Sequence, residues 1–388
     1  MPSEEPVPDP VSDRVSEPVP DISVPFRAGQ EGYASFRIPA VVATTDPTTA
    51  DDRRLVLAFC EGRVSSRSDA GDIDIVLKRS LDGGRTWGPL QVVARNGHDL
   101  AGNPAPVVLD TGRVLLVHVR NRATATEDAI RRGTVPAADG RRVWVKHSDD
   151  AGLTWSEARE ITDRVKRTGW RWYATTPGHA LQLTTGRVVV PANHSLPPTD
   201  TDTGTDTDTG TEGRYYGGHS LLSDDHGTTW RIGYVDDHPE GYVNANETTV
   251  AELPDGRLYF NTRTDSPSPG TRADAHSTDG GATLVKPFRP QAGLAGPVVQ
   301  GSLLHLGAPD VLLYSGPAAP ASRALMTLRR STDGGTTWAS AYTVDGLPAA
   351  YSDLVRVDER TVGLLYETGD FSAYETLTFR RIPVADLA

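Results

Sequence analysis

Three carboxylates lie close together in residues 65–76, where Asp69, Asp72 and Asp74 follow a run of serines. A carboxyl group beside a reacting bond acts as a general acid when it is protonated and as a general base when it is ionised. Asp74 is expected along the strand that follows, whereas Asp69 falls in the polar loop before it. The segment therefore offers candidates for proton transfer, with loop capping as the alternative role for Asp69.

Two further pairs of polar residues are each separated by sixteen positions. Glu247 precedes Arg263, and Tyr351 precedes Glu367. An interval of this length suits two residues on the paired strands of one β-hairpin, which would place both at the same face of a β protein. Taken one at a time, these residue types have ordinary structural explanations, because most arginines are solvated surface charges and a tyrosine or glutamate is common at a turn or a strand edge.

The composition excludes several classes of protein and site. The 388 residues contain 39 Lys and Arg against 51 Asp and Glu, a formal net charge of -12, which argues against a nucleic-acid partner. No apolar run approaches the roughly 20 residues that span a bilayer. Cys60 is the only cysteine, which excludes an intrachain disulfide framework and a multi-cysteine zinc site, and we expect it to be a small buried hydrophobe. The ten histidines show no ligand spacing, so no metal or cofactor is implied.

The elements that must position the candidate residues are short strands. With 38 Gly and 29 Pro, the chain favours an all-β, turn-rich class. A helix is indicated only in part of Thr126–Arg132. Strands are predicted in short stretches rich in β-branched or aromatic residues: Arg54–Ala58, Val114–Val119, Val188–Pro191, Leu258–Asn261, Val311–Tyr314 and Val362–Tyr366.

An octapeptide with the pattern Ser-x-Asp-x-Gly-x-Thr-Trp recurs five times. The copies are Ser80–Trp87, Ser148–Trp155, Ser223–Trp230, Ser277–Leu284 (with Leu in place of Trp) and Ser331–Trp338. In such a turn the Asp carboxylate accepts hydrogen bonds from amides, the Gly supplies a positive φ, and the Trp ring packs beside the turn. The octapeptides are therefore interpreted as structural turns, and repeats that each hold several short strands indicate a β-propeller.

Two biased tracts lie outside this pattern. Residues 1–25 alternate Pro, Ser, Val and acidic residues without the basic and apolar regions of a signal peptide, and they are predicted to be a disordered, Pro-rich lead-in. Residues 199–213 contain no apolar side chain and are predicted to be a low-complexity surface loop. We therefore expect one propeller domain over residues 26–388. A cytoplasmic location is the default expectation, with secretion as the alternative if a leader precedes this sequence.

The octapeptides resemble the Asp boxes of sialidases. The segment Phe36-Arg37-Ile38-Pro39 is similar to the Arg-Ile-Pro motif that precedes the first box in that family. The resemblance covers roughly residues 30–383 and is to bacterial exo-sialidases, also called neuraminidases. It implies a six-bladed β-propeller that acts as an exo-α-sialidase, a glycoside hydrolase that releases terminal sialic acid with retention of configuration through a covalent tyrosine intermediate.

Three arginines match the family's arginine triad. Arg37 lies in the Arg-Ile-Pro motif, Arg263 ends a predicted strand, and Arg323 lies eight residues before the serine of the last box. A guanidinium group is always charged and presents a bidentate fork that suits a carboxylate. The resemblance implies that these three residues hold the carboxylate of the sugar acid.

The catalytic residues that the resemblance implies are Asp69, Glu247 and Tyr351. A carboxylate nucleophile would be repelled by the substrate carboxylate next to the anomeric carbon, whereas a neutral phenol avoids this repulsion. A free tyrosine has a pKa of about 10, so Glu247 must act as its general base within hydrogen-bond reach. Asp69 aligns with the acid that protonates the leaving oxygen, and Asp72 and Asp74 are the fallback candidates.

Supporting residues are implied in the same way. Glu367 resembles the acid that orients Arg37, and Arg63 resembles an arginine that contacts the sugar. Asn103 lies where members of the family have a polar sugar contact. An aromatic cluster that either lines the pocket or packs in the core consists of Trp170, Trp172 and Tyr173.

Alternative functions stay open at this stage. The same catalytic set would serve a hydrolase that prefers a deaminated nonulosonic acid (Kdn) or a trans-sialidase that transfers the sugar to an acceptor. A non-catalytic, glycan-binding propeller would be expected to lack the Tyr/Glu pair or an arginine, and this sequence retains every one. The expected partners are sialylated glycans or free sialosides, and the expected state is a monomer.

Overall fold

The structure of the chain is a computed structural model, which describes residues 21–45, 54–197, 216–237, 243–264 and 270–387. Strands make up nearly all of the regular structure. The helices of the described residues are α1 (Glu127–Arg132), α2 (Thr162–Val165) and a 3₁₀ helix at Val384–Asp386. None of the described helices is long and apolar enough to cross a membrane.

The described strands form five sheets. The first has the order β1 (Ile22–Arg27), β25 (Thr376–Pro383), β24 (Thr361–Thr368), β23 (Ala349–Asp358). The second has the order β10 (Tyr173–Thr175), β12 (Val188–Ser195), β13 (Tyr216–Ser223), β14 (Arg231–Asp236), and β11 (Leu181–Gln182) also pairs with β12. The third runs β15 (Ala245–Glu252), β16 (Leu258–Thr264), β17 (Thr271–Ser277), β18 (Arg289–Ala295). The fourth runs β19 (Ser302–His305), β20 (Leu312–Pro317), β21 (Met326–Ser331), β22 (Ala339–Thr343).

The fifth sheet is the largest. It has eight strands in the order β2 (Ser35–Thr45), β3 (Arg54–Arg63), β4 (Ile73–Ser80), β6 (Leu100–Val108), β7 (Val114–Asn121), β8 (Arg142–Ser148), β9 (Arg159–Glu160), and β5 (Gln91–Ala94) pairs with β4. Its two halves, β2 to β5 and β6 to β9, are joined by one parallel pairing between Ile73 and Leu100. The expectation of six separate sheets is therefore not met in the described residues, because this pairing merges two of them.

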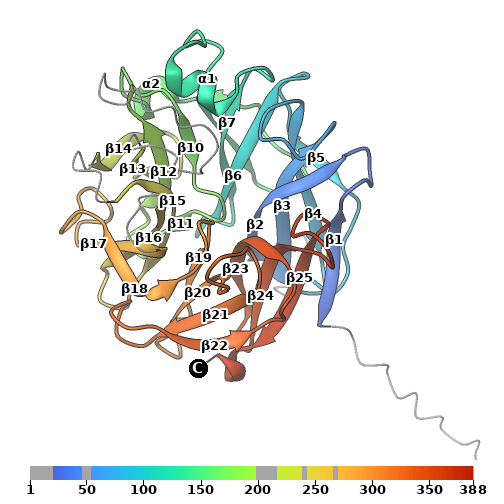
Figure 1. The fold of residues 1–388 in the computed structure, drawn as a ribbon, viewed down its shortest axis with the longest axis vertical. Helices are drawn as coiled ribbons and strands as arrows, with labels where there is room; N and C mark the ends of the chain where they lie inside the picture. Colours follow the sequence, from blue (N-terminus) through green and yellow to red (C-terminus); the bar gives the residue numbers. More distant parts are fainter. Residues whose placement is uncertain (1–20, 46–53, 198–215, 238–242, 265–269, 388) are drawn as a thin grey trace, which may run out of the picture.

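The sheets stand side by side around a common centre, like the blades of a propeller (Figure 1). Strand β2 contacts β23 on one side and β6 on the other, and β15 contacts β12 and β19 in the same way. Such inner strands are covered on both faces, and nearly every residue of β2 is buried. The all-β propeller predicted from the repeat is confirmed.

Strand β1 closes the ring. It pairs in antiparallel fashion with β25, so that the beginning and the end of the described chain share one sheet. Ile22–Pro25 lie in this strand, and the predicted disordered lead-in therefore extends too far by these residues. Most of that lead-in, residues 1–20, and the predicted surface loop at 199–213 lie outside the described residues.

The five octapeptides form nearly identical turns. In the first, Ser80 Oγ donates to Asp82 Oδ1 at 2.7 Å and accepts from Gly84 N at 2.7 Å, while Asp82 accepts from the amide and the hydroxyl of Thr86 at 2.9 and 2.6 Å. The same contacts recur around Asp150, Asp225, Asp279 and Asp333. The structural role assigned to these octapeptides agrees with this geometry.

Each of these turns also abuts the sheet before it. Gly84 has a φ of 89°, and a side chain there would collide with Phe379 of β25. Trp87 of the same turn packs edge-on against Phe379, with ring centroids 5.4 Å apart. Trp338 of the last turn packs in a similar way on Tyr259 of β16, at 5.9 Å. The octapeptides thus join neighbouring sheets as well as closing hairpins.

The predicted helix, the buried cysteine and the predicted strands are all observed, with one small difference. Helix α1 begins after Thr126, whose side chain accepts a hydrogen bond from Ala129 N, and it ends at Gly133 in the left-handed conformation. Cys60 is fully buried in an apolar cluster, as expected, and burial raises the pKa of its thiol. The predicted strands all coincide with observed strands, apart from Val311, which lies one residue before β20.

Candidate active site

The candidate catalytic residues gather at one face of the propeller. Arg37, Glu247 and Tyr351 each lie near the start of an inner strand, in β2, β15 and β23 respectively. Ser80, which begins the first octapeptide, pairs with Val56 of β3. Val56 in turn pairs with Ala43, near the end of β2, so the octapeptide lies at the opposite end of that strand from Arg37. We call the end that carries Tyr351 the site face and the end that carries the octapeptides the box face.

The two pairs separated by sixteen residues lie as predicted on antiparallel hairpins. Glu247 in β15 and Arg263 in β16 belong to one hairpin, and Tyr351 in β23 and Glu367 in β24 belong to another. The loop of each hairpin is at the box face, so both members of each pair return to the site face. This is how a regular fold brings four polar residues from distant sequence positions to one place.

Four inner strands are irregular at the residues that carry the site. Their pairing shifts register between Arg37 and Ala40, between Gly102 and Ala105, between Ala245 and Thr248, and between Ala349 and Ser352. A β-bulge of this kind leaves backbone groups unpaired and re-aims a side chain. Ile38 and Asn103, inside two of the shifts, adopt positive φ values of 59° and 53°, which are uncommon outside glycine. The bulges turn the candidate side chains toward the centre of the site face.

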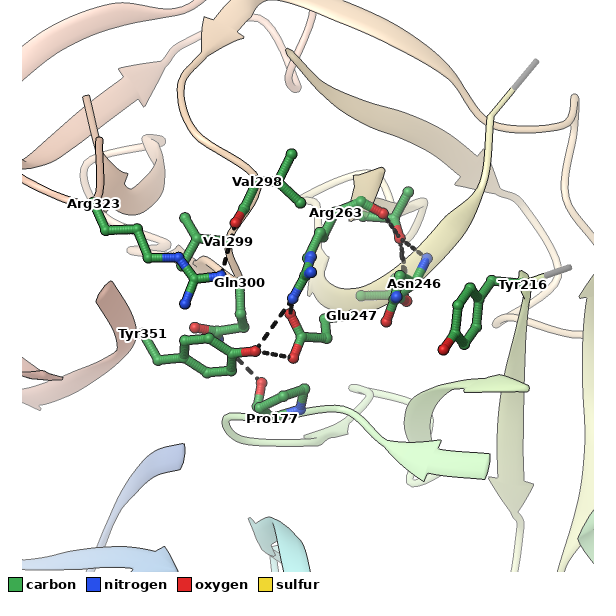
Figure 2. A network of polar contacts seen from close by, with 12 residues as sticks. Pro177, Tyr216, Asn246, Glu247, Arg263, Val298, Val299, Gln300, Arg323 and Tyr351 are labelled. Atoms are coloured by element: carbon green, nitrogen blue, oxygen red, sulfur yellow. Dashed lines mark hydrogen bonds and ion pairs between the residues drawn. The ribbon is translucent and has the colours of Figure 1, made fainter. Parts of the chain in front are cut away.

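Tyr351 is hydrogen bonded to Glu247 and Arg263 (Figure 2). Its hydroxyl donates to Glu247 Oε1 and accepts from Arg263 Nη1 at 3.3 Å, while Arg263 Nη1 also lies 3.0 Å from Glu247 Oε2. The tyrosine is 6% exposed. Burial and the Glu247 charge raise the pKa of Tyr351 well above 10, against the opposing effect of the arginines. The phenol is therefore neutral, and a base is already in place to accept its proton.

The three predicted arginines surround this tyrosine. The guanidinium carbons of Arg37 and Arg323 lie 5.3 and 6.0 Å from the centre of the Tyr351 ring, and Arg263 contacts its hydroxyl. Arg323 is held by Tyr374 Oη at 3.1 Å and by the carbonyl of Val298 at 3.0 Å, the second of which is visible in Figure 2. Three positive charges around one buried phenol form a site for an anion.

Glu367 orients the first of these arginines. Its Oε1 accepts from Arg37 Nε at 2.7 Å and from Ile38 N at 3.0 Å, and its Oε2 accepts from Tyr351 N at 3.2 Å. The carboxylate is fully buried. The two unpaired amides of the bulges at Ile38 and Tyr351 are thus satisfied by the same side chain that pairs with Arg37.

Of the three carboxylates in residues 65–76, Asp69 is the one that pairs with Arg63. Asp69 Oδ1 lies 2.7 Å from Arg63 Nη1, and 75% of its side chain is exposed. Desolvation opposes ionisation, but the charges of Arg63 and Arg37 outweigh it and lower the pKa of Asp69. Asp74 is buried and bonded to Tyr33 and Arg95 instead, and Asp72 pairs with His98. Both fallback candidates therefore have structural partners.

Arg63 is held rigidly behind Asp69. It is 2% exposed, and its Nε and Nη2 donate to Glu61 Oε2 at 3.0 and 2.7 Å. The remaining Nη1 donates to the carbonyl of Arg67 at 2.5 Å and pairs with Asp69. The loop that carries Asp69 is therefore anchored to a strand through one buried arginine.

Comparison with known proteins agrees with this geometry. A family model described as a BNR repeat-like domain matches residues 54–366. An exo-alpha-sialidase of Aspergillus fumigatus is 31% identical over 382 residues, which cover 90% of this chain and 84% of that protein. The chain belongs to the sialidase family. A sialidase of Micromonospora viridifaciens is 33% identical over 356 residues, covering 88% of this chain but 51% of that protein.

A solved structure extends the comparison to three dimensions. The Hadza microbial sialidase Hz136 superposes with a TM-score of 0.76 and 26% sequence identity, covering 93% of this chain and 68% of that one. Members of the family are glycoside hydrolases, and this sialidase is accordingly an enzyme of that class.

The sialidase site contains residues that sequence reasoning did not single out. Arg141 is 3% exposed, donates to Asn103 Oδ1 at 2.8 Å and stacks over Trp172, with 3.9 Å between its guanidinium carbon and the ring centre. Burial lowers the pKa of Arg141 to about 10. The backbone N–H of Asn103 in turn donates to Glu61 Oε1 at 2.8 Å. Glu61 and Arg141 thus extend the network from Arg63 to the predicted polar contact at Asn103.

A second unforeseen pair lies further along the same face. Glu127, the first residue of α1, accepts a hydrogen bond from the hydroxyl of Tyr216. Burial raises the pKa of Glu127 to about 7, although the charges of Arg141, Arg131 and Arg263 oppose the shift. Nothing in the sequence indicated that Glu127 would pair with Tyr216, because the two residues lie 89 positions apart.

The three rings of the predicted aromatic cluster all pack in the core. Trp170 and Tyr173 belong to one apolar cluster, and Trp170 stacks on His194 with ring centroids 3.6 Å apart. Trp172 belongs to a smaller apolar cluster with Ile130, and Arg141 stacks over its ring. Of the two roles considered, core packing therefore applies to all three rings.

Proposed function

We propose that the protein is an exo-α-sialidase that releases terminal sialic acid from sialylated glycans and free sialosides with retention of configuration. The observation that carries this proposal is the hydrogen-bonded pair of Tyr351 and Glu247 inside a ring of three arginines. A buried neutral phenol with an adjacent base is suited to attack a carbon that bears a carboxylate, because it brings no negative charge of its own.

Substrate binding rests on Arg37, Arg263 and Arg323. Their guanidinium groups converge near the Tyr351 ring and would hold the carboxylate of the sugar acid beside the hydroxyl of the nucleophile. Glu367 accepts a hydrogen bond from Arg37 Nε, so the guanidinium group of Arg37 is already oriented before the substrate binds. Arg63 would contact the sugar from the neighbouring strand.

In the first step the oxygen of Tyr351 forms a bond to the anomeric carbon while the bond to the leaving oxygen breaks. Glu247 takes the proton of the phenol, and Asp69 gives a proton to the leaving oxygen. In the free protein the arginines keep Asp69 ionised. A bound substrate carboxylate offsets part of that positive charge and raises the pKa of Asp69, which favours the protonated form that the step requires.

In the second step water attacks the anomeric carbon and the bond to Tyr351 breaks. Asp69, now a carboxylate, takes a proton from the water, and the tyrosine oxygen regains its proton from Glu247. Two displacements at one carbon return the original configuration. Transfer to a sugar acceptor would follow the same path with an acceptor hydroxyl in place of water.

We further propose that the fold is a six-bladed propeller formed by one domain, which includes Ile22–Pro25 of β1 in addition to the predicted residues 26–388, and that it acts as a monomer. The support for six blades is that the eight-stranded sheet divides into two four-stranded halves joined at one residue pair. Counting those halves separately gives six units around the axis. Closure of the ring by β1 and β25 supports a single domain.

The proposal is tested by measuring cleavage of an aryl α-sialoside by the wild-type protein and by Tyr351→Phe and Asp69→Ala. Loss of turnover in Tyr351→Phe is the expected result, and near wild-type turnover in both variants would overturn the mechanism. Relative rates on N-acetyl and deaminated (Kdn) donors, with and without lactose as acceptor, separate the sialidase from the Kdn hydrolase and the trans-sialidase.

A further inference from the structure

A buried carboxylate lies at the centre of the propeller, two residues after Tyr351. Asp353 is 1% exposed and accepts four hydrogen bonds. One comes from Val41 N of β2 at 2.8 Å, one from Ser302 Oγ of β19 at 2.7 Å, and two from His179 of the segment between β10 and β11, through N at 2.9 Å and Nδ1 at 2.8 Å. One side chain of β23 therefore connects three other parts of the ring.

The strand around Tyr351 needs this support because its backbone pairing is interrupted. The register of β23 against β24 shifts between Ala349 and Ser352, so Tyr351 lies inside the bulge. Its amide donates to the side chain of Glu367 of the neighbouring strand β24. Side-chain contacts therefore support the nucleophile where the regular backbone pairing is interrupted.

Gln300 supports the next residue in a similar way. Its Oε1 accepts from Ser352 N at 3.0 Å, and its Nε2 donates to Ser352 O at 3.0 Å and to the carbonyl of Pro177 at 3.1 Å. Gln300 and Pro177 lie directly beside Tyr351 in Figure 2. The same segment that supplies His179 to Asp353 is therefore tied to Ser352 as well.

The strongest contact between this segment and β23 is the imidazole–carboxylate pair of His179 and Asp353. Asp353 raises the pKa of His179, and this effect outweighs the lowering by burial, so the contact favours the protonated imidazole beside a buried carboxylate. The segment is closely packed on the carboxylate, because a Cβ on Gly178 would lie 2.9 Å from Asp353 Oδ1. The other donors to Asp353, Val41 and Ser302, are neutral.

The box-face side of His179 is open. The residue lines a cavity of about 640 Å³ whose other walls include Leu181, Val250, Leu303 and Leu306. The imidazole is 13% exposed. His179 thus lies between this cavity and Asp353.

We propose that His179 and Asp353 are positioning residues for the nucleophile, whose ion pair holds strand β23 so that Tyr351 meets Glu247 and the arginines. This inference rests on the proposed function, since it assigns Tyr351 as the group that is positioned. Neither residue touches the substrate. Their effect is on the geometry of the attack, where a displacement of about 1 Å costs on the order of 10²-fold in rate.

The experiment compares His179→Gln, Asp353→Asn and the double variant with the wild-type protein on an aryl α-sialoside. Active sites are titrated with a 2,3-difluorosialic acid, which reports the tyrosines that can react, and thermal unfolding is followed in parallel. We expect kcat per titrated site to fall by about tenfold or more in His179→Gln, with KM changed by less than about threefold because the arginines are untouched.

The double variant distinguishes an ion pair from two independent contacts. His179→Gln leaves the buried Asp353 carboxylate without its cation, whereas the double variant is neutral and retains hydrogen-bonding groups at both positions. We therefore expect the double variant to recover at least about threefold of the lost kcat. Ser302→Ala removes one hydrogen bond to Asp353 without changing charge and is expected to lower kcat by about threefold, so the proposal stays testable if a charge variant does not fold.

His305→Gln is the matched control. His305 Nε2 contacts Asp310 Oδ1 at 2.8 Å at the far end of β19, so its loss removes an imidazole–carboxylate pair that does not touch β23. The inference is overturned if kcat per titrated site in His179→Gln and Ser302→Ala stays within twofold of wild type, or falls no further than in His305→Gln. If the wild-type protein itself cleaves no sialoside, the proposed function fails instead.

Discussion

The two faces of the propeller are built in opposite ways. At the box face, five turns repeat one set of contacts, with an Asp that accepts from the same Thr groups each time. At the site face, the inner strands are bulged and each contact occurs once, as between Glu367 and Arg37. The repeated turns thus build the frame of the propeller, while the irregular strands carry the candidate catalytic residues.

The carboxylates of the two faces also have different partners. At the box face, hydrogen bonds from Thr337 and Ser331 lower the pKa of Asp333 to about 2. At the site face, arginines are the main partners, as for Glu367 and Asp69. Substitutions at the site face should therefore change rate or binding, whereas substitutions at the box face should change stability alone.

The largest effect is expected for Tyr351→Phe, which keeps the ring between the arginines and removes the nucleophilic oxygen. Turnover of an aryl α-sialoside should fall by at least about 10³-fold. The melting temperature should stay within about 2 °C of wild type, because Glu247 keeps its ion pair with Arg263. A variant that retains turnover, or one that melts early, would contradict the division between the faces.

Asp69→Ala should have a smaller effect that depends on the leaving group. Removing the general acid should slow cleavage of a sialylated disaccharide by about 10²-fold or more, because a sugar alkoxide leaves poorly without a proton. The loss should be several-fold smaller with a 4-nitrophenyl leaving group, which needs no protonation. Steady-state rates on the two donors provide the measurement, and equal losses on both would argue against an acid role for Asp69.

Glu367→Gln should affect both stability and binding, because Glu367 is buried and pairs with Arg37. The change leaves Arg37 without its buried partner and should lower the free energy of unfolding by about 3–5 kcal/mol. It should also raise KM. Free sialic acid should raise the melting temperature of this variant less than that of wild type, because an Arg37 that has lost its orienting partner binds the carboxylate more weakly. Equal shifts in a thermal scan would show that the sugar acid does not bind at Arg37.

Asp333→Asn tests the box face and should have the smallest effect. Loss of the charged acceptor should lower the free energy of unfolding by about 1 kcal/mol at neutral pH and leave kcat and KM unchanged. Because the pKa of Asp333 is lower in the folded state than in the unfolded chain, its contribution is present above about pH 4 and is lost as pH falls toward 2. Denaturation curves of the two proteins should therefore approach each other as pH falls toward 2, and a difference that is undiminished there would rule out the carboxylate as its source.

The sequence predicted the regular part of the molecule well. The octapeptides identified the propeller, and the sixteen-residue intervals anticipated the hairpins of Glu247 with Arg263 and of Tyr351 with Glu367. These features are visible because they repeat or because both members lie on neighbouring strands. The candidate residues of the site came from the resemblance to a family, since each of them taken alone has an ordinary structural explanation.

What escaped prediction is the irregular part. A bulge adds one residue to a strand and has no sequence signal when the residue is Ile38 or Asn103, because neither is a glycine. Arg141 lies 38 residues from Asn103, and Glu127 lies 89 residues from Tyr216, so no local spacing connects them. The merging of two blades depends on a single pairing between Ile73 and Leu100, which is equally invisible in the sequence.

The closure of the ring by β1 has a consequence for how the enzyme is made. Strand β1 pairs with β25, and Arg37 pairs with Glu367 330 residues later in the chain. A polypeptide still emerging from the ribosome lacks the strand that completes the sheet of Tyr351, however well its earlier hairpins have formed. Contacts between segments so far apart in the sequence are slow to form. We therefore expect the recovery of activity after dilution from denaturant to follow the pairing of β1 with β25, and not the formation of the earlier hairpins.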